Sequence, residues 1–263
     1  MKHHADTRNA GAPGPLHGAL LAPQPLYRQV RNAIVDGLSR GEWKPGEMLP
    51  NERRLADRFG VGIATVRAAV SELAATKVLA RRQGKGTYVA LQDERRSIYQ
   101  FFHVVRNDGV KNLPVSELVG LKKARADAQT AYLLNLGPRP ESLQVYKLRN
   151  VLKVAGIPVV ISDIAIPAAL FPGLTEHRIR TGGVTLYAAY QSLYGVNIVR
   201  ASEQLRAVKA DALTSKLLAV KAGEPVLEVR RIAYTFNDVP VEVRRSRVET
   251  DNYYYFVDQG AVR

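Results

Sequence analysis

Hydrophobic positions recur at helical spacing three times in the first third of the chain. The first series repeats every fourth residue and comprises Leu26, Val30, Ile34 and Leu38. It predicts an amphipathic helix that begins after Pro25 and ends near Gly41. A second, shorter helix follows Asn51, whose side chain can cap it, and ends at Gly60 in a left-handed conformation.

A third helix is predicted from about Ile63 to Ala75. Three of its positions form the inward face: Val66, Val70 and Leu73. Four positions remain for the outside: Ile63, Thr65, Arg67 and Ser71. The second and third helices, joined across the tight turn at Gly60, form a helix-turn-helix.

Alternating residues after the third helix predict a hairpin. Short strands at residues 78–80 and 87–89 flank a basic tip that comprises Arg81, Arg82, Gln83, Gly84, Lys85 and Gly86. Such a hairpin directly after a helix-turn-helix is a wing, because its cations can neutralise phosphates and glycine lets the backbone approach a groove closely. A merely solvated charged hairpin is the alternative, and the three helices before it favour DNA binding.

The remaining two thirds of the chain alternate strand and helix patterns. Strand patterns occupy residues 117–125, 143–167, 197–208 and 225–249, and helix patterns occupy residues 127–136, 185–195 and 211–220. Two of the strand segments are long enough to fold back, with turns expected at Gly156-Ile157-Pro158 and at Asn237-Asp238. Strands joined by hairpins imply a mainly antiparallel sheet with helices packed against it, so the fold class is α+β.

The charge of the chain points to a polyanionic partner. Its 263 residues include 38 Lys and Arg against 24 Asp and Glu, a formal net charge of +14. Between residues 25 and 92 there are 12 Lys and Arg against 6 acidic residues. The predicted DNA-binding unit is therefore basic by itself.

The composition of the chain also indicates its cellular compartment and bears on whether it holds a metal, a cofactor or catalytic residues. With no cysteine and no apolar run long enough to span a bilayer, the chain is expected to be a cytoplasmic protein with no membrane partner. Residues 1–24 mix Gly, Pro, Ala and His without a period and are predicted to be a disordered arm, and the charged residues 91–97 are predicted to be a linker. The histidines and acidic residues show no metal-ligand spacing or nucleophile elbow, so we expect no metal, no cofactor and no catalytic residue.

Four segments of residues 25–90 resemble the winged helix-turn-helix of the GntR family of bacterial transcriptional regulators: PLYRQV, GEWKPGEMLPNERRLADRFGV, TVRAAVSEL and RRQGKGTYV. The resemblance implies a homodimer, usually a repressor, on a palindromic double-stranded DNA operator. The positions that it places at DNA are Arg53, Thr65, Arg67, Gln83 and Gly84, and the charge of the wing adds Arg81, Arg82 and Lys85. A guanidinium can grip either a phosphate or a guanine in bidentate fashion.

Ile63 departs from the GntR pattern. Family members commonly carry an arginine there, whereas this chain reads GIAT at residues 62–65. An isoleucine cannot donate to a guanine but can pack against a thymine methyl group. The operator sequence is therefore expected to differ from those of relatives.

Residues 98–263 resemble the UTRA effector domain of HutC-like GntR regulators, which shares its fold with chorismate lyase. The segments that carry the resemblance are FFHVVRNDG, GIPVV, LFPGL, TLYAAY, YGV, LEVRRIAYTFNDVPVE and DNYYYF. It implies an antiparallel sheet with packed helices that binds a small effector and forms the dimer.

Sugar-phosphate-binding members of that subfamily use two arginines and a glutamate that correspond here to Asn150, Leu152 and Ser162, so the phosphate clamp is missing. The candidate effector-binding residues are therefore Phe101, Phe102, Arg149, Asn150, Ser162, Thr185, Tyr187 and Glu242. Arg149 would have to turn inward, because its strand position puts it on the opposite face. Plain core packing is the alternative for the tyrosine and the two phenylalanines.

This set of residues suits a small metabolite with an apolar body and a carboxylate better than a phosphosugar. A nearby arginine from another strand, Arg230 or Arg231, would restore phosphate binding. Two other function classes remain open at this stage. One is a chorismate-lyase-like enzyme with a DNA-binding domain, although a fold does not carry its function with it. The other is a constitutive DNA-coating protein, which explains the charge but leaves the second domain without a purpose.

Overall fold

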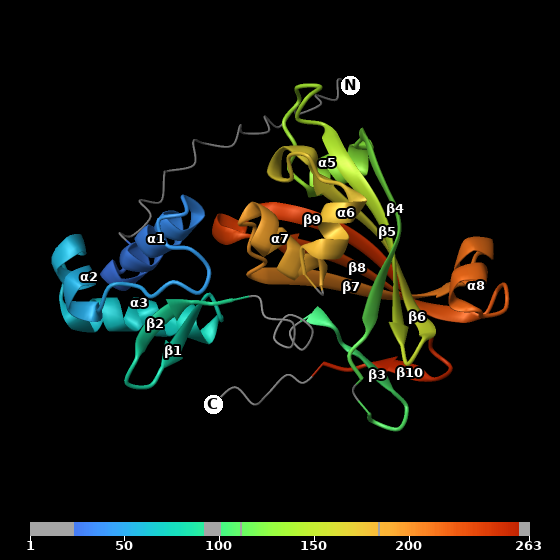
Figure 1. Cartoon of the computed structure of the whole chain (residues 1–263), viewed down its shortest axis with the longest axis horizontal. Helices are drawn as coiled ribbons and strands as arrows, with labels where there is room; N and C mark the ends of the chain where they lie inside the picture. Colours follow the sequence, from blue (N-terminus) through green and yellow to red (C-terminus); the bar gives the residue numbers. More distant parts are fainter. Residues whose placement is uncertain (1–23, 92–100, 111, 184, 258–263) are drawn as a thin grey trace, which may run out of the picture.

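The computed structural model describes residues 24–91, 101–110, 112–183 and 185–257, and within them the chain forms two domains (Figure 1). The predicted arm and the predicted linker lie outside the described residues, apart from Gln24 and Leu91. None of the helices in the described ranges is long and apolar enough to cross a membrane.

The first domain is a winged helix-turn-helix. Its elements are α1 (Leu26–Ser39), α2 (Glu52–Phe59), α3 (Ile63–Ala75), β1 (Leu79–Arg82) and β2 (Gly86–Val89). The predicted helix ends are confirmed: the Asn51 side chain accepts a hydrogen bond from the Arg54 backbone N–H, and Gly60 ends α2 with a φ of 64°. The apolar faces of the three helices meet in one core around Ile34 and Val66.

The wing has a shorter tip than predicted. Arg81 and Arg82 belong to β1 and Gly86 belongs to β2, because the two strands stay paired up to Arg82 and Gly86. Only Gln83, Gly84 and Lys85 form the turn, where Gly84 has a φ of 69° that favours glycine.

The second domain is built on a long antiparallel sheet. Its strands are β3 (Val104–Arg106), β4 (Val115–Arg125), β5 (Gln144–Val154), β6 (Ile157–Pro167), β7 (Arg200–Lys209), β8 (Pro225–Tyr234), β9 (Pro240–Val248) and β10 (Tyr253–Tyr255). Six of them form one sheet in the order β4-β5-β6-β9-β8-β7, while β3 pairs with β10. The predicted α+β fold with an antiparallel sheet is confirmed.

The helices of the second domain are α5 (Ala128–Leu133), η1 (Ala168–Leu170), α6 (Glu176–Thr181), α7 (Leu186–Tyr194), α8 (Ala212–Leu218) and η2 (Phe236–Asp238). In Figure 1, α6 and α7 lie together against the sheet, whereas α8 lies near its far end. The main core fills the space between α6, α7 and the inner face of the sheet, with Phe171 and Tyr190 almost completely buried.

One predicted turn, Gly156-Ile157-Pro158, is right only at Gly156. The hairpin between β5 and β6 turns at Ala155 and Gly156, which have φ values of 49° and 82°, while Ile157 and Pro158 already belong to β6. A two-residue turn with positive φ at both positions matches the right-handed twist of the strands. Proline is tolerated at the start of a strand.

The two domains contact each other through η2 and α7. Phe236 of η2 is buried in the core of the winged-helix domain, and the Asn237 side-chain amide donates to Asp36 of α1 over 2.9 Å. From α7, the Gln191 amide donates to the carbonyl of Ala90, directly after the wing, over 3.4 Å. Elements of the second domain therefore help to hold the first.

Candidate DNA-binding surface and effector pocket

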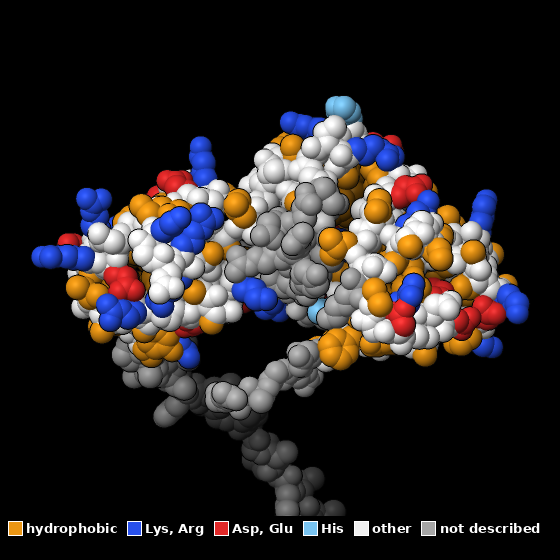
Figure 2. Space-filling model, turned by 60° about the horizontal axis from the view of Figure 1, so that its bottom comes forward, with side chains coloured by type: hydrophobic (Ala, Val, Ile, Leu, Met, Phe, Trp, Pro, Cys, Tyr) orange, Lys and Arg blue, Asp and Glu red, His pale blue; other side chains and the backbone are white. Residues whose placement is uncertain are grey.

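The first turns of α3 present the predicted DNA-binding side chains. Ile63 and Arg67 are exposed and Thr65 is half-buried, and Arg53 is exposed on α2. The buried positions of α3, such as Val66, anchor the helix in the core and leave this face outward. Lys and Arg side chains project around the winged-helix domain, at left in Figure 2. Exposed cations and hydrogen-bond donors of this kind are the groups that contact DNA phosphates and base edges.

Glu52, at the start of α2, was not among the residues predicted for this surface. Its carboxylate accepts a hydrogen bond from Nε of Arg67 over 2.9 Å and lies 3.6 Å from Nη2 of Arg81. Arg81 also donates to the hydroxyl of Ser71 over 3.0 Å. One acidic residue thus links α2, α3 and the wing. An acid in the first turn is a common helix start, so nothing in the sequence distinguishes this role.

The wing holds its remaining cations outward. The guanidinium of Arg82 lies over the ring of Tyr88, 4.6 Å from its centroid, and Lys85 is exposed at the tip beside Gln83 and Gly84. Exposed ion pairs and stacked guanidinium groups contribute little to stability. These side chains can therefore leave their present partners and bind phosphates at a small cost in stability.

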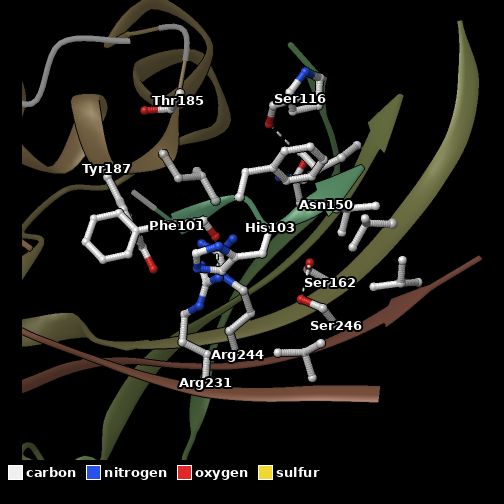
Figure 3. A pocket seen from close by; sticks show the side chains of 18 of the residues that line it. Phe101, His103, Ser116, Asn150, Ser162, Thr185, Tyr187, Arg231, Arg244 and Ser246 are labelled. Atoms are coloured by element: carbon white, nitrogen blue, oxygen red, sulfur yellow. Dashed lines mark hydrogen bonds between the residues drawn. The ribbon is translucent and has the colours of Figure 1, made fainter. Parts of the chain in front are cut away.

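The predicted effector-binding residues converge on a cavity of about 100 Å³ between the inner face of the sheet, the start of α7 and the segment before β3. Six of them line it: Phe101, Phe102, Asn150, Ser162, Thr185 and Tyr187. Figure 3 labels all of them except Phe102 and shows the labelled side chains around one space, carried by different elements. A water molecule needs only about 10 to 15 Å³ by such a measure, so the cavity has room for a small metabolite.

Two candidates lie elsewhere. Arg149 faces the other side of the sheet, where Nη2 lies 2.7 Å from Asp163, and it does not line the cavity. The alternation of side chains along β5 puts it opposite to Asn150, so it does not turn inward. Glu242 faces inward but is completely buried beneath the cavity, behind Arg244. Its carboxylate therefore holds other side chains and does not line the space.

Several cavity residues were missed from the sequence. The structure adds His103, Ser116, Arg244 and Ser246 to the lining, and of the two arginines named from the sequence, Arg230 and Arg231, it places Arg231 there. In each of the segments EVRR of β8 and β9 one arginine faces inward and its neighbour faces outward, and only the register of the strands decides which. Arg230 therefore faces away from the cavity, and Arg231 faces into it, so the arginine expected to restore phosphate binding is present and a phosphate is the competing anion for this cavity.

Glu242 organises the base of the cavity. It accepts hydrogen bonds from the hydroxyls of Tyr187 and Tyr190, over 3.0 and 2.9 Å, and from Nε and Nη2 of Arg244, over 2.8 and 3.0 Å. Burial, with the charge of Glu242, raises the pKa of both tyrosines. Burial alone would lower the pKa of Arg244, but the charge and hydrogen bonds of Glu242 and the two tyrosines together outweigh it, so the pKa is raised and the arginine stays cationic.

Arg231 is held in a similar way by different partners. Its Nε donates to Glu203 of β7 over 2.5 Å and its Nη2 donates to the carbonyl of Phe101. Glu203 also accepts a hydrogen bond from Tyr255, whose pKa is raised by burial and by that hydrogen bond. Both arginines are thus fixed by carboxylates on one side and face the cavity on the other.

Neutral polar groups lie beside the arginines. The hydroxyls of Ser162 and Ser246 are 2.8 Å apart, and the Ser116 hydroxyl donates to Oδ1 of Asn150 over 3.1 Å. Thr185 caps α7 by accepting from the Ala188 backbone N–H. Across the described ranges of the chain, no group of three or more His, Asp or Glu side chains is placed to hold a metal ion.

Comparison with known families now places both domains. The model of bacterial regulatory proteins of the gntR family matches residues 26–89, and the UTRA domain model matches residues 111–254, more than half of the chain. The chain belongs to the GntR family and carries a UTRA domain. It is a transcriptional regulator, and the alternative of a chorismate-lyase-like enzyme is set aside because its relatives are named as transcriptional repressors.

Named relatives align with nearly the full length of this GntR regulator. The HTH-type transcriptional repressor NagR of Bacillus subtilis is 27% identical over 235 residues, which cover 88% of this chain and 93% of the relative. The histidine utilization repressor of Pseudomonas putida is 28% identical over 226 residues, covering 83% and 88%.

Solved structures agree with these matches. The ligand-binding domain of a putative GntR-family regulator from Bordetella bronchiseptica is 35% identical, with a TM-score of 0.56, and covers 61% of this chain and 98% of its own. PhnF from Mycobacterium smegmatis is 26% identical, with a TM-score of 0.50, over 88% and 99%.

Proposed function

We propose that this GntR regulator is a repressor that binds a palindromic operator as a dimer and responds to a small metabolite in the UTRA cavity. The observation that carries the proposal is the position of α7. Tyr187 of α7 lines the cavity, and Gln191, one helical turn further on, donates to the carbonyl of Ala90, directly after the wing. A ligand against Tyr187 therefore acts on the same helix that touches the DNA-binding domain.

The relatives support repression and leave the effector open. Their names include repressors of fructoselysine utilization in Escherichia coli and of histidine utilization in Pseudomonas putida. Those compounds differ in chemistry, so an effector is not transferred by similarity alone. A ligand shifts the equilibrium between two placements of the winged-helix domains only if it binds the two arrangements with different affinities.

Footprinting tests the proposal. The full chain is used to select binding sites from random duplexes, and the selected duplexes are footprinted. We expect protection of a discrete palindrome, and a dimer in light scattering. Uniform protection along every duplex would instead indicate a DNA-coating protein, and a monomer on the selected site would contradict the dimer.

Arg67 is expected to read a base. It is exposed on α3, close to Ile63, which replaces the usual arginine. Arg67→Ala should weaken binding to the selected palindrome by about 1 to 3 kcal/mol and binding to random DNA much less. Equilibrium titrations on both duplexes measure this. Equal losses would make Arg67 a phosphate contact, and Glu52→Gln, which retains the arginine, should preserve the discrimination.

Phe236 is expected to couple the two domains. Its ring is 7% exposed and lies in the core of the winged-helix domain although it belongs to η2. Phe236→Ala should destabilise the first domain by about 3 to 5 kcal/mol and split thermal unfolding into two transitions. Calorimetry measures this, with Val239→Ala, 45% exposed in the same loop, as the control. A single, unshifted transition would show that the contact couples nothing.

A further inference from the structure

The inner face of the sheet presents three successive rows of side chains to the cavity, and each row has its own chemistry. One row pairs Arg244 with Arg231 across β9 and β8. The next row, two residues along each strand, runs Asn150, Ser162, Ser246 and Val229 across β5, β6, β9 and β8. The third row runs Leu152, Val160, Val248. The cavity therefore has arginines at one end, mainly neutral polar side chains in the middle and apolar side chains at the other end.

The arginine pair is unfavourable by itself. Arg231 and Arg244 are direct cross-strand partners, and their side chains are only 9% and 11% exposed. Like charges directly opposite each other destabilise a sheet, and burial strengthens the repulsion. Glu203 and Glu242 offset part of this repulsion, and an anion between the two guanidinium groups would offset it further.

Each arginine still has hydrogen-bond donors to offer. Arg244 gives Nε and Nη2 to Glu242, and Arg231 gives Nε to Glu203 and Nη2 to Phe101. None of these bonds uses Nη1 of either arginine. Figure 3 shows the two guanidinium groups side by side, directed into the cavity next to His103. The carboxylates hold the arginines in place, and both guanidinium groups line the ligand space.

We propose that the effector is a small amphipathic carboxylic acid. Its carboxylate lies against Nη1 of Arg231 and Arg244, its centre lies along the Ser162 and Ser246 hydroxyls, and its apolar end lies against Val160. Two donor groups match the two oxygens of a carboxylate, whereas a phosphate has three terminal oxygens and more charge to satisfy. This assignment rests on the proposed function, because it names the ligand of the same cavity.

Calorimetry on the full chain without DNA tests the ligand class. The probes are hexanoate, benzoate and phenylacetate, with hexanamide as the uncharged match of hexanoate and inorganic phosphate and glucosamine 6-phosphate as the competing anions. We expect at least one carboxylate to bind, and hexanoate to bind at least about tenfold more tightly than hexanamide. This comparison uses the unmodified protein, so it does not depend on any variant folding.

Matched variants locate the carboxylate. Arg231→Met should raise the dissociation constant of the bound acid at least about tenfold, whereas Arg230→Met, one residue earlier and facing away from the cavity, should leave it unchanged. No binding of any carboxylate, or tighter binding of glucosamine 6-phosphate, would overturn the ligand class. Footprinting separates this proposal from the proposed function. Protection of the palindrome by a protein that binds none of the acids refutes only the ligand class. An acid that binds without altering the footprint refutes only the control of DNA binding by the ligand.

Discussion

Replacing Glu242 with alanine should lower the free energy of unfolding by about 3 to 5 kcal/mol, because it leaves a buried charge without its partner. Arg244 is 11% exposed at its side chain, and Glu242 takes both of the hydrogen bonds that hold it. The hydroxyls of Tyr187 and Tyr190 lose their acceptor in the same variant. Urea denaturation followed by fluorescence measures the change.

Asp163→Ala is the matched control for this variant. Asp163 lies on β6, the neighbour of β9, and pairs with Arg149 and Arg245 on the outer face of the sheet, where its side chain is 27% exposed. Its loss should change the free energy of unfolding by at most about 1 kcal/mol. Similar values for the two variants would mean that Glu242 does not hold the base of the cavity.

The winged-helix domain could be predicted closely because its determinants are local. The apolar spacing of each helix, the cap at Asn51 and the stop at Gly60 all lie within a few residues of the elements they define. The wing strands were predicted too short, because the reach of their pairing depends on the turn that Gly84 allows. Glu52 was missed, because its role depends on bringing α3 and the wing to the same place.

The cavity could be predicted only in part. Residues that stand at family positions, such as Asn150 and Ser162, do line it. Arg231 and Arg244 could not be assigned, because an arginine pair in a strand always has one member on each face and the register is set by pairing between distant segments. Strands β6 and β9 are neighbours in the sheet, but β7 and β8 lie between them along the chain. No local sequence pattern encodes that pairing.

The wing is expected to supply a large, sequence-independent part of the DNA affinity. Changing Arg81, Arg82 and Lys85 to alanine should weaken binding to every duplex. It should also flatten the plot of log affinity against log salt by up to about one unit for each lost phosphate contact, or about three units in total. When a phosphate contact is lost, fewer counterions are released from the DNA on binding, so the slope changes together with the affinity. Titrations between low and physiological salt measure both.

A control of equal charge separates phosphate contact from net charge. Lys122, Lys123 and Arg125 are exposed on β4 of the UTRA domain, so their change to alanine removes the same three charges away from the wing. Because only charges close to DNA displace its counterions, this variant should keep the slope of the unmodified protein. If both triple variants change the slope equally, the net charge of the chain is responsible and the wing does not contact phosphates. An unchanged slope in the wing variant would refute the phosphate contacts directly.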